Sequence, residues 1–236
     1  MSKTFLKAEW RKLIMANYVI DQRILNKYLP YKTEIDLWEG NCYVSLIGFL
    51  FKNTKIKGLS IPFHSNFEEA NLRFYVRYND NGISKRGVVF IKEIVPKFAL
   101  TLVANMVYNE KYETMPMEHS WESSNGKLNV EYKWKKGAWN SLKVIAEPIA
   151  TEIENGSKEE FITEHYWGYT KISTAKTSEY GVEHPKWKVY PVEDFKIDVD
   201  FERIYGNDFG FLKIEKPDSI FLAEGSEIEV KDGRVI

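Results

Sequence analysis

The chain has 236 residues, of which 44% are hydrophobic and 28% charged, the composition of a globular protein with a large core. Its 33 basic and 34 acidic residues leave a net charge of -1, which gives no electrostatic reason to expect nucleic-acid or membrane partners. Cys42 is the single cysteine, so an intramolecular disulfide and a multi-cysteine metal site are excluded. With no signal-like N-terminus and no apolar run of membrane-spanning length, the sequence predicts a cytoplasmic protein.

The first part of the chain predicts a strand followed by a short helix. Residues 5–19 lack a clean period and favour a twisted strand over a helix. Asp21 is a good N-cap for a helix of about two turns, which Pro30 ends. The segments that follow are two strands, residues 34–38 and 42–51, and then a loop or edge strand, residues 52–65.

The strongest hydrophobic pattern lies between residues 66 and 95. Leu72, Phe74 and Val76 alternate with polar or amphipathic residues, the period-two signature of a strand with one dry face. An Asn-Asp-Asn-Gly turn at residues 79–82 leads into a second strand at residues 87–94. Together these segments predict a β-hairpin.

The rest of the chain predicts further short strands. Asn125-Gly126 is the strongest hairpin signal, residues 152–160 an exposed loop, and residues 201–205 one helical turn. The strands expected are residues 112–117, 121–123, 128–134, 139–146, 165–172, 180–183, 187–192, 195–200, 209–214, 219–222 and 228–231. Many short strands with few helices predict one domain over residues 1–236, a mostly antiparallel β-barrel or sandwich with one or two packed helices.

A chemically suggestive corner follows the hairpin. Pro96 ends its second strand and opens a helix whose apolar residues extend to Val107. Lys97 then lies near the positive end of this helix, where a desolvated amine would be a nucleophile able to form a Schiff base with a carbonyl compound. The alternative is an exposed corner lysine without a chemical role.

Carboxylates flank this corner. Glu68 and Glu69 lie at the start of the hairpin and Glu93 near its end, where they serve as general acids or bases or as ordinary solvated residues. The sequence contains no P-loop, GxGxxG, HExxH or GxSxG motif, and its four histidines lack metal-site spacing. We therefore predict neither a cofactor nor a metal.

Aromatic residues are dense enough to line a β-enclosed pocket, although a large β core needs them too. His165 lies in the block His-Tyr-Trp-Gly-Tyr, where burial can shift its pKa. The residues predicted to contact a ligand are Glu68, Arg73, His165 and Trp167.

Eight blocks carry a family resemblance: AEWRKLIMANY, YLPYKTEIDLWEG, YVSLIGFLF, NFEEANLRFYVR, RGVVFIKEIVP, EHYWGYT, VEHPKW and FLAEGS. They resemble an uncharacterised bacterial family, YqjF-like, over nearly the whole chain. That family is in turn similar to the acetoacetate decarboxylase superfamily. The resemblance implies a curved antiparallel β-barrel or cone around a buried pocket.

The resemblance to the decarboxylases also implies roles for single residues. The matching segments are Arg11, Tyr28-Leu29-Pro30, Phe67-Glu68-Glu69, Lys92-Glu93 and Pro96-Lys97-Phe98. They imply that Lys97 is the Schiff-base nucleophile, that Glu69 and Glu93 orient groups or exchange protons, and that Arg11 holds a substrate carboxylate. Phe98 departs from the pattern, because the decarboxylases have a second lysine there that activates the first.

Two functions remain open. The first is a protein without chemistry, either one whose aromatic-lined pocket binds a small keto acid or apolar ligand or an oligomer whose barrel is mainly structural. The alternative is a Schiff-base-forming lyase or decarboxylase-like enzyme that uses Lys97, ranked second because Phe98 replaces the activating lysine. A small molecule is the expected partner, and the sequence leaves open whether the chain forms a homo-oligomer.

Overall fold

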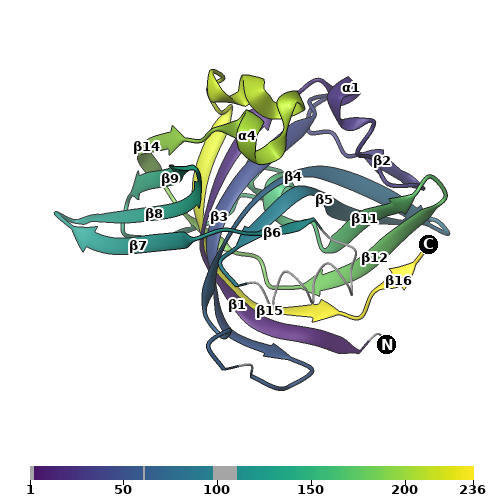
Figure 1. The fold of residues 1–236 in the computed structure, drawn as a ribbon, viewed down its shortest axis with the longest axis horizontal. Helices are drawn as coiled ribbons and strands as arrows, with labels where there is room; N and C mark the ends of the chain where they lie inside the picture. Colours follow the sequence, from purple (N-terminus) through teal and green to yellow (C-terminus); the bar gives the residue numbers. More distant parts are fainter. Residues whose placement is uncertain (1–2, 61, 98–110) are drawn as a thin grey trace.

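The computed structural model describes residues 3–60, 62–97 and 111–236. Within these residues, most of the regular structure lies in a twelve-stranded sheet and a four-stranded sheet (Figure 1). The strands of the large sheet are β1 (Thr4–Val19), β2 (Thr33–Ile35), β3 (Tyr43–Ile56), β4 (Phe67–Asp80), β5 (Ile83–Val95), β6 (Tyr112–Thr114), β10 (Thr151–Glu152), β11 (Trp167–Ser173), β12 (Lys176–Glu183), β13 (Lys188–Tyr190), β15 (Ser219–Lys231) and β16 (Arg234–Val235). The small sheet holds β7 (Met117–Ser124), β8 (Lys127–Lys136), β9 (Ala138–Ala146) and β14 (Val192–Asp198). The helices are α1 (Gln22–Leu25), α3 (Lys158–Thr163), α4 (Phe201–Tyr205) and the 3-10 helix η1 (Asn207–Lys213).

The large sheet curls until two distant strands meet. Hydrogen-bonded neighbours follow the order β15, β1, β3, β4, β5, β11 and β12, and β12 then also pairs with β15. That last pairing sets Val182 opposite Val230 and Glu183 opposite Glu229. Within this order only β5 with β11 is parallel in the described residues. The predicted curved, mainly antiparallel sheet is confirmed.

Strand β4 is buried on both sides of this curled sheet. Leu72, Phe74 and Val76 pack into a large hydrophobic cluster on the outer side, as the alternation predicted. Asn71 and Arg73 point to the inner side and are also buried, with 1% and 8% of their surface exposed. The expectation of a single dry face was therefore wrong, because the curl of the sheet also encloses the polar face.

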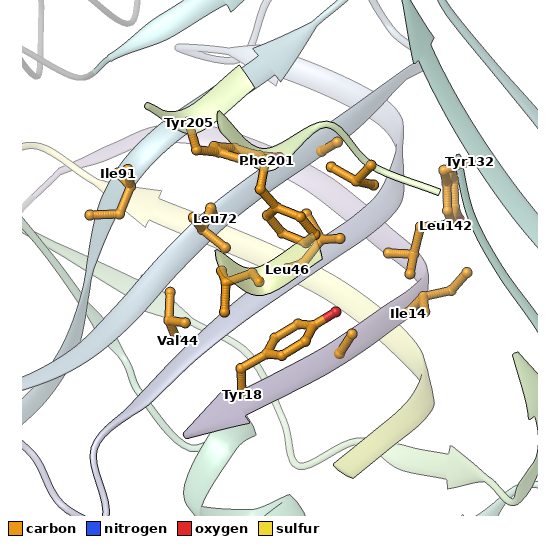
Figure 2. Packing of buried hydrophobic residues seen from close by; sticks show 14 of the residues in the cluster. Ile14, Tyr18, Val44, Leu46, Leu72, Ile91, Tyr132, Leu142, Phe201 and Tyr205 are labelled. Atoms are coloured by element: carbon orange, nitrogen blue, oxygen red, sulfur yellow. The ribbon is translucent and has the colours of Figure 1, made fainter. Parts of the chain in front are cut away.

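The small sheet and the C-terminal helices cover the outer side. Figure 2 shows Phe201 of α4 beside Leu46 and Leu72 of the large sheet, while Tyr132 of the small sheet lies near Ile14. All five residues belong to one hydrophobic cluster. The two sheets and α4 therefore share a core.

Several predicted elements are confirmed and others are corrected. The hairpin at Asn125-Gly126 joins β7 to β8, and Asp21 caps α1 by accepting a hydrogen bond from the Arg23 backbone at 2.9 Å, although α1 is shorter than predicted. The predicted loop at residues 152–160 instead enters α3, and residues 209–214 lie in η1 and its C-cap rather than a strand. Residues 219–222 and 228–231 belong to the continuous strand β15.

The helix predicted after Pro96 falls on residues outside those the structure describes. Among the described residues, no helix combines the length and apolar character needed to cross a bilayer.

Gly225 marks a close approach between β15 and β1. Its φ is +79°, and a Cβ atom there would lie 2.0 Å from the Trp10 carbonyl oxygen. We expect Gly225→Ala to lower the free energy of unfolding by at least about 2 kcal/mol, since it adds left-handed strain to overpacking. Denaturant unfolding measures the loss.

Gly58→Ala is the matched control for this prediction. Gly58 has a φ of +82° but nothing within 4 Å of an added Cβ atom. It should therefore show only the backbone strain, about 1 kcal/mol. Equal losses in the two variants would mean that the contact with Trp10 contributes nothing.

Candidate functional site

The inner side of the curled sheet encloses a cavity of about 120 Å³. Its wall takes residues from β1, β3, β4, β5, β6, β11, β12 and β15, so the cavity depends on the meeting of β12 with β15. An engineered protein cavity of about 150 Å³ holds benzene, so this smaller cavity suits a ligand of up to roughly six non-hydrogen atoms.

Most of the cavity wall is apolar, and much of it is aromatic. Trp10 meets the edge of Phe49 with ring centroids 5.5 Å apart, and Phe51 stacks on Phe67 at 4.6 Å. Such a wall favours the hydrocarbon part of a ligand, while the few polar groups in it decide orientation and specificity.

Two buried carboxyl groups lie in one part of this wall. Glu69 on β4 and Glu93 on β5 are each 2% exposed. Tyr112 donates its hydroxyl to Glu69 Oε2 at 3.2 Å, and Asn71 Nδ2 donates to Glu69 Oε1 at 2.9 Å. Burial and the two neighbouring glutamates raise the pKa of Tyr112 well above its usual value, so its phenol keeps its proton.

Arg73 provides a positive charge further along β4. It lies four residues beyond Glu69, roughly 13 Å at the rise of an extended strand. Among the described residues no carboxylate lies within ion-pairing distance of its guanidinium. Nη2 donates to the Ile162 carbonyl at 3.4 Å, and the buried Nε has no partner. A buried cation without a counter-charge is costly, so this part of the cavity favours an anion.

His165 lies in the same part of the wall as Arg73. Its ring lies 4.7 Å from the ring of Tyr75, and the Arg73 guanidinium carbon lies 5.6 Å from that same ring. His165 Nε2 is 3.2 Å from Asp36 Oδ2, which also accepts a hydrogen bond from Arg86 Nε at 2.7 Å. His165 lines the cavity wall and Asp36 does not. The hydrogen bond that orients the His165 ring therefore comes from outside the cavity.

The protonation of this pair follows from its surroundings. Burial lowers the pKa of His165 to about 4, against the opposing effect of Asp36. Burial raises the pKa of Asp36, but hydrogen bonds from His165 and Arg86 outweigh it and the net pKa lies below its ordinary value. At neutral pH a neutral imidazole therefore donates its Nε2 proton to a carboxylate. Its Nδ1 is left as a bare acceptor, without a partner among the described residues.

The structure brings five of the predicted site residues together. The cavity wall contains Glu69, Glu93, Arg73, His165 and Trp167.

The other three predicted residues lie elsewhere. Arg11 is partly exposed and pairs with Glu9 at 2.6 Å. Glu68 points to the opposite side of β4 from Glu69 and contacts His119 Nδ1 at 2.7 Å. Lys97 is half-buried and does not belong to the cavity wall formed by the described residues. It follows two residues after Val95, which does line the cavity.

Sequence reasoning missed several polar residues of the wall, among them Asn71, Tyr112 and Thr163. Asn71 could have been found, because it shares its strand face with Glu69 and Arg73. Tyr112 could not, because its place depends on the parallel pairing of β6 with β5. In the described part of the chain, no group of three or more His, Cys, Asp or Glu residues could hold a metal.

A family model and a curated relative match most of the chain. The family model DUF2071, described as an uncharacterized conserved protein, matches residues 7–227. The uncharacterized protein YqjF of Bacillus subtilis (strain 168) is 24% identical over 191 residues, which cover 80% of this chain and 76% of YqjF.

Solved structures resemble the chain over nearly its whole length. Acetoacetate decarboxylase from Legionella pneumophila superposes with a TM-score of 0.66 at 11% identity, covering 98% of this chain and 87% of its own. The enduracididine biosynthesis enzyme MppR, solved in complex with pyruvate, gives 0.67 at 12% identity, covering 100% and 91%. At these identities the likeness establishes the fold alone.

The burial of His165 predicts the direction in which its pKa is shifted. In an NMR titration of the histidine ring carbons, we expect His165 to titrate near pH 4 because burial opposes its charge. Asp36→Asn removes the carboxylate whose negative charge and hydrogen-bond acceptance raise this pKa, so we expect the pKa to fall further. A His165 titration near the ordinary value of 6.5 would contradict the buried placement.

The lowered pKa of His165 also affects how the stability of the folded chain depends on pH. Between pH 6.5 and about 4 the unfolded chain binds a proton at His165 that the folded chain does not. This group therefore makes unfolding easier as the pH falls through that range.

Proposed function

The chain belongs to the DUF2071 family, and from its acetoacetate decarboxylase-like fold and the polar wall of its cavity we propose that it binds a small organic acid of short keto-acid size inside the curled sheet. The observation that carries this proposal is Arg73, a buried residue of the cavity wall whose guanidinium forms no ion pair with any described carboxylate and whose Nε has no partner among the described residues.

The energetics of Arg73 support an anionic ligand. A guanidinium removed from water loses its hydration, and the carbonyl of Ile162 at 3.4 Å replaces little of it. A ligand carboxylate can accept two parallel N–H bonds from the guanidinium fork. Binding would then supply the counter-charge that the fold omits.

The size and character of the cavity support a small ligand with an apolar remainder. A volume of about 120 Å³ suits an acid of three or four carbons, by comparison with the slightly larger cavity that holds benzene. The aromatic wall around Trp10 and Phe49 would contact its hydrocarbon part. The pyruvate complex of MppR supports the same class of ligand for this fold.

Binding is favoured over Schiff-base chemistry by the position of Lys97. An imine-forming lysine must reach a carbonyl group inside the cavity, whereas Lys97 is half-buried and is not part of the described wall. The chemical alternative rests on the nearness of Val95, which does line the cavity two residues earlier. It is the second candidate function.

Arg73→Met tests the proposal, since it removes the charge but keeps a long apolar side chain. With a panel of pyruvate, acetoacetate, lactate and butanoate, we expect calorimetry to show at least about tenfold weaker binding of the tightest acid, the loss of a charged hydrogen bond. Stability should be unchanged or higher, because an unpaired buried charge is removed.

Arg77→Met is the matched control. Arg77 lies on the same strand as Arg73 but is exposed, with an ion pair to Glu34 at 2.9 Å. Its removal should change neither binding nor stability by much. Undiminished binding in Arg73→Met, or a large stability loss in that variant, would mean that Arg73 serves the fold instead.

Borohydride trapping separates binding from chemistry. Reduction of the protein with pyruvate or acetoacetate fixes any imine as a stable adduct that peptide mass spectrometry locates. We expect no adduct at Lys97, because its amine lies outside the described wall. A ligand-dependent adduct at Lys97 that disappears in Lys97→Arg would establish the enzymatic alternative.

A further inference from the structure

The wall near Arg73 presents an acceptor as well as a donor. Nδ1 of His165 is buried and unpartnered among the described residues, as is Nε of Arg73. Both side chains line the cavity and both contact the ring of Tyr75. A ligand that packs against these two side chains can therefore draw on N–H donors of one residue and a nitrogen lone pair of the other.

The acceptor character of His165 is fixed by its other ring nitrogen. A carboxylate can only accept hydrogen bonds, so Asp36 requires the proton on Nε2 at 3.2 Å. Arg86 holds Asp36 in place through its Nε at 2.7 Å, and its guanidinium also lies 4.7 Å from the ring centre of Phe161. Asp36 and Arg86 belong to a shallow groove on the other side of this wall. The tautomer is thus set from outside the cavity.

From this geometry we infer that the cavity selects a 2-hydroxy acid over the 2-oxo acid of the same carbon skeleton. The inference rests on the proposed function, because the carboxylate must first be held by Arg73. A hydroxyl group beside that carboxylate can donate its hydrogen to His165 Nδ1. A keto oxygen has no hydrogen to donate, so it would leave Nδ1 buried and unpaired, next to a second acceptor.

His165 acts here as a specificity-determining residue, and Asp36 as a positioning residue that acts through it. No bond forms or breaks in this inference. A site built to hydrogen-bond one group discriminates strongly against an analogue that lacks it, because the buried polar atom is then left without a partner.

The test compares matched acids on the full chain. Calorimetry with both enantiomers of lactate against pyruvate, and of 2-hydroxybutanoate against 2-oxobutanoate, should show the better hydroxy acid binding at least about tenfold more tightly in each pair. Equal binding, or tighter binding of both oxo acids, would overturn the inference and leave the proposed function intact.

Variants of His165 and Asp36 distinguish a role in ligand selection from a purely structural role, because only the first predicts a change in the preference between hydroxy and oxo acids. His165→Phe keeps a ring at this place but removes Nδ1 and leaves no acceptor, while Arg86 still pairs with Asp36. The hydroxy preference should then disappear while binding of the oxo acids changes by less than about threefold. Asp36→Asn can present its amide N–H to Nε2, which moves the imidazole proton to Nδ1 and makes it a donor toward the cavity. The preference should then shift toward the oxo acid.

The same variants distinguish failure of this inference from failure of the proposed function. If Asp36→Asn and His165→Phe remain folded by circular dichroism yet keep the hydroxy preference of the unchanged chain, the inference is overturned. If neither class of acid binds, or if Arg73→Met binds both as well as before, the proposed function fails and the inference falls with it.

Discussion

The pairing of β12 with β15 is the contact on which the site depends. It joins Val182 to Val230 and so brings together strands that are not neighbours in the order of the rest of the sheet. In an open sheet the polar face of β4 would meet water, where Asn71 and Arg73 need no partners. Because the sheet curls, that face becomes the wall of a cavity, and each of its polar atoms acquires a cost unless something inside satisfies it.

The two faces of β4 therefore differ in role, since the outer face packs in the core and the inner face lines the cavity. Leu72 and Phe74 on the outer side are fully buried in the cluster that joins both sheets, and such burial contributes roughly 1.5–3 kcal/mol for each large side chain. Glu69 and Arg73 on the inner side hold polar groups in a dry space. Stabilising contacts on one side of a strand allow the other side to carry binding groups that would be unfavourable in an ordinary core.

The sequence predicts local features of this arrangement better than distant ones. Alternation identified the face of Leu72 correctly, but it cannot tell what covers the face of Arg73, because the covering strands β12 and β15 lie more than 100 residues further along. The start of α3 was predictable, since Ser157 and Glu160 have capping-box spacing and Ser157 does accept the Glu160 N–H at 3.2 Å. Neighbouring glutamates at 68 and 69 could not both reach the cavity, because successive side chains of a strand point to opposite faces.

The order of groups along β4 also sets how a ligand would lie. The carboxyl groups of Glu69 and Glu93 and the guanidinium of Arg73 are separated along the strand, so the polarity of the wall changes from one part to the other. A ligand carboxylate would turn toward Arg73, and its substituents would then meet His165 on one side and the aromatic rings on the other. A decarboxylase-like fold can thus support recognition without a lysine in the described wall, since function belongs to the groups that a fold presents and not to the fold itself.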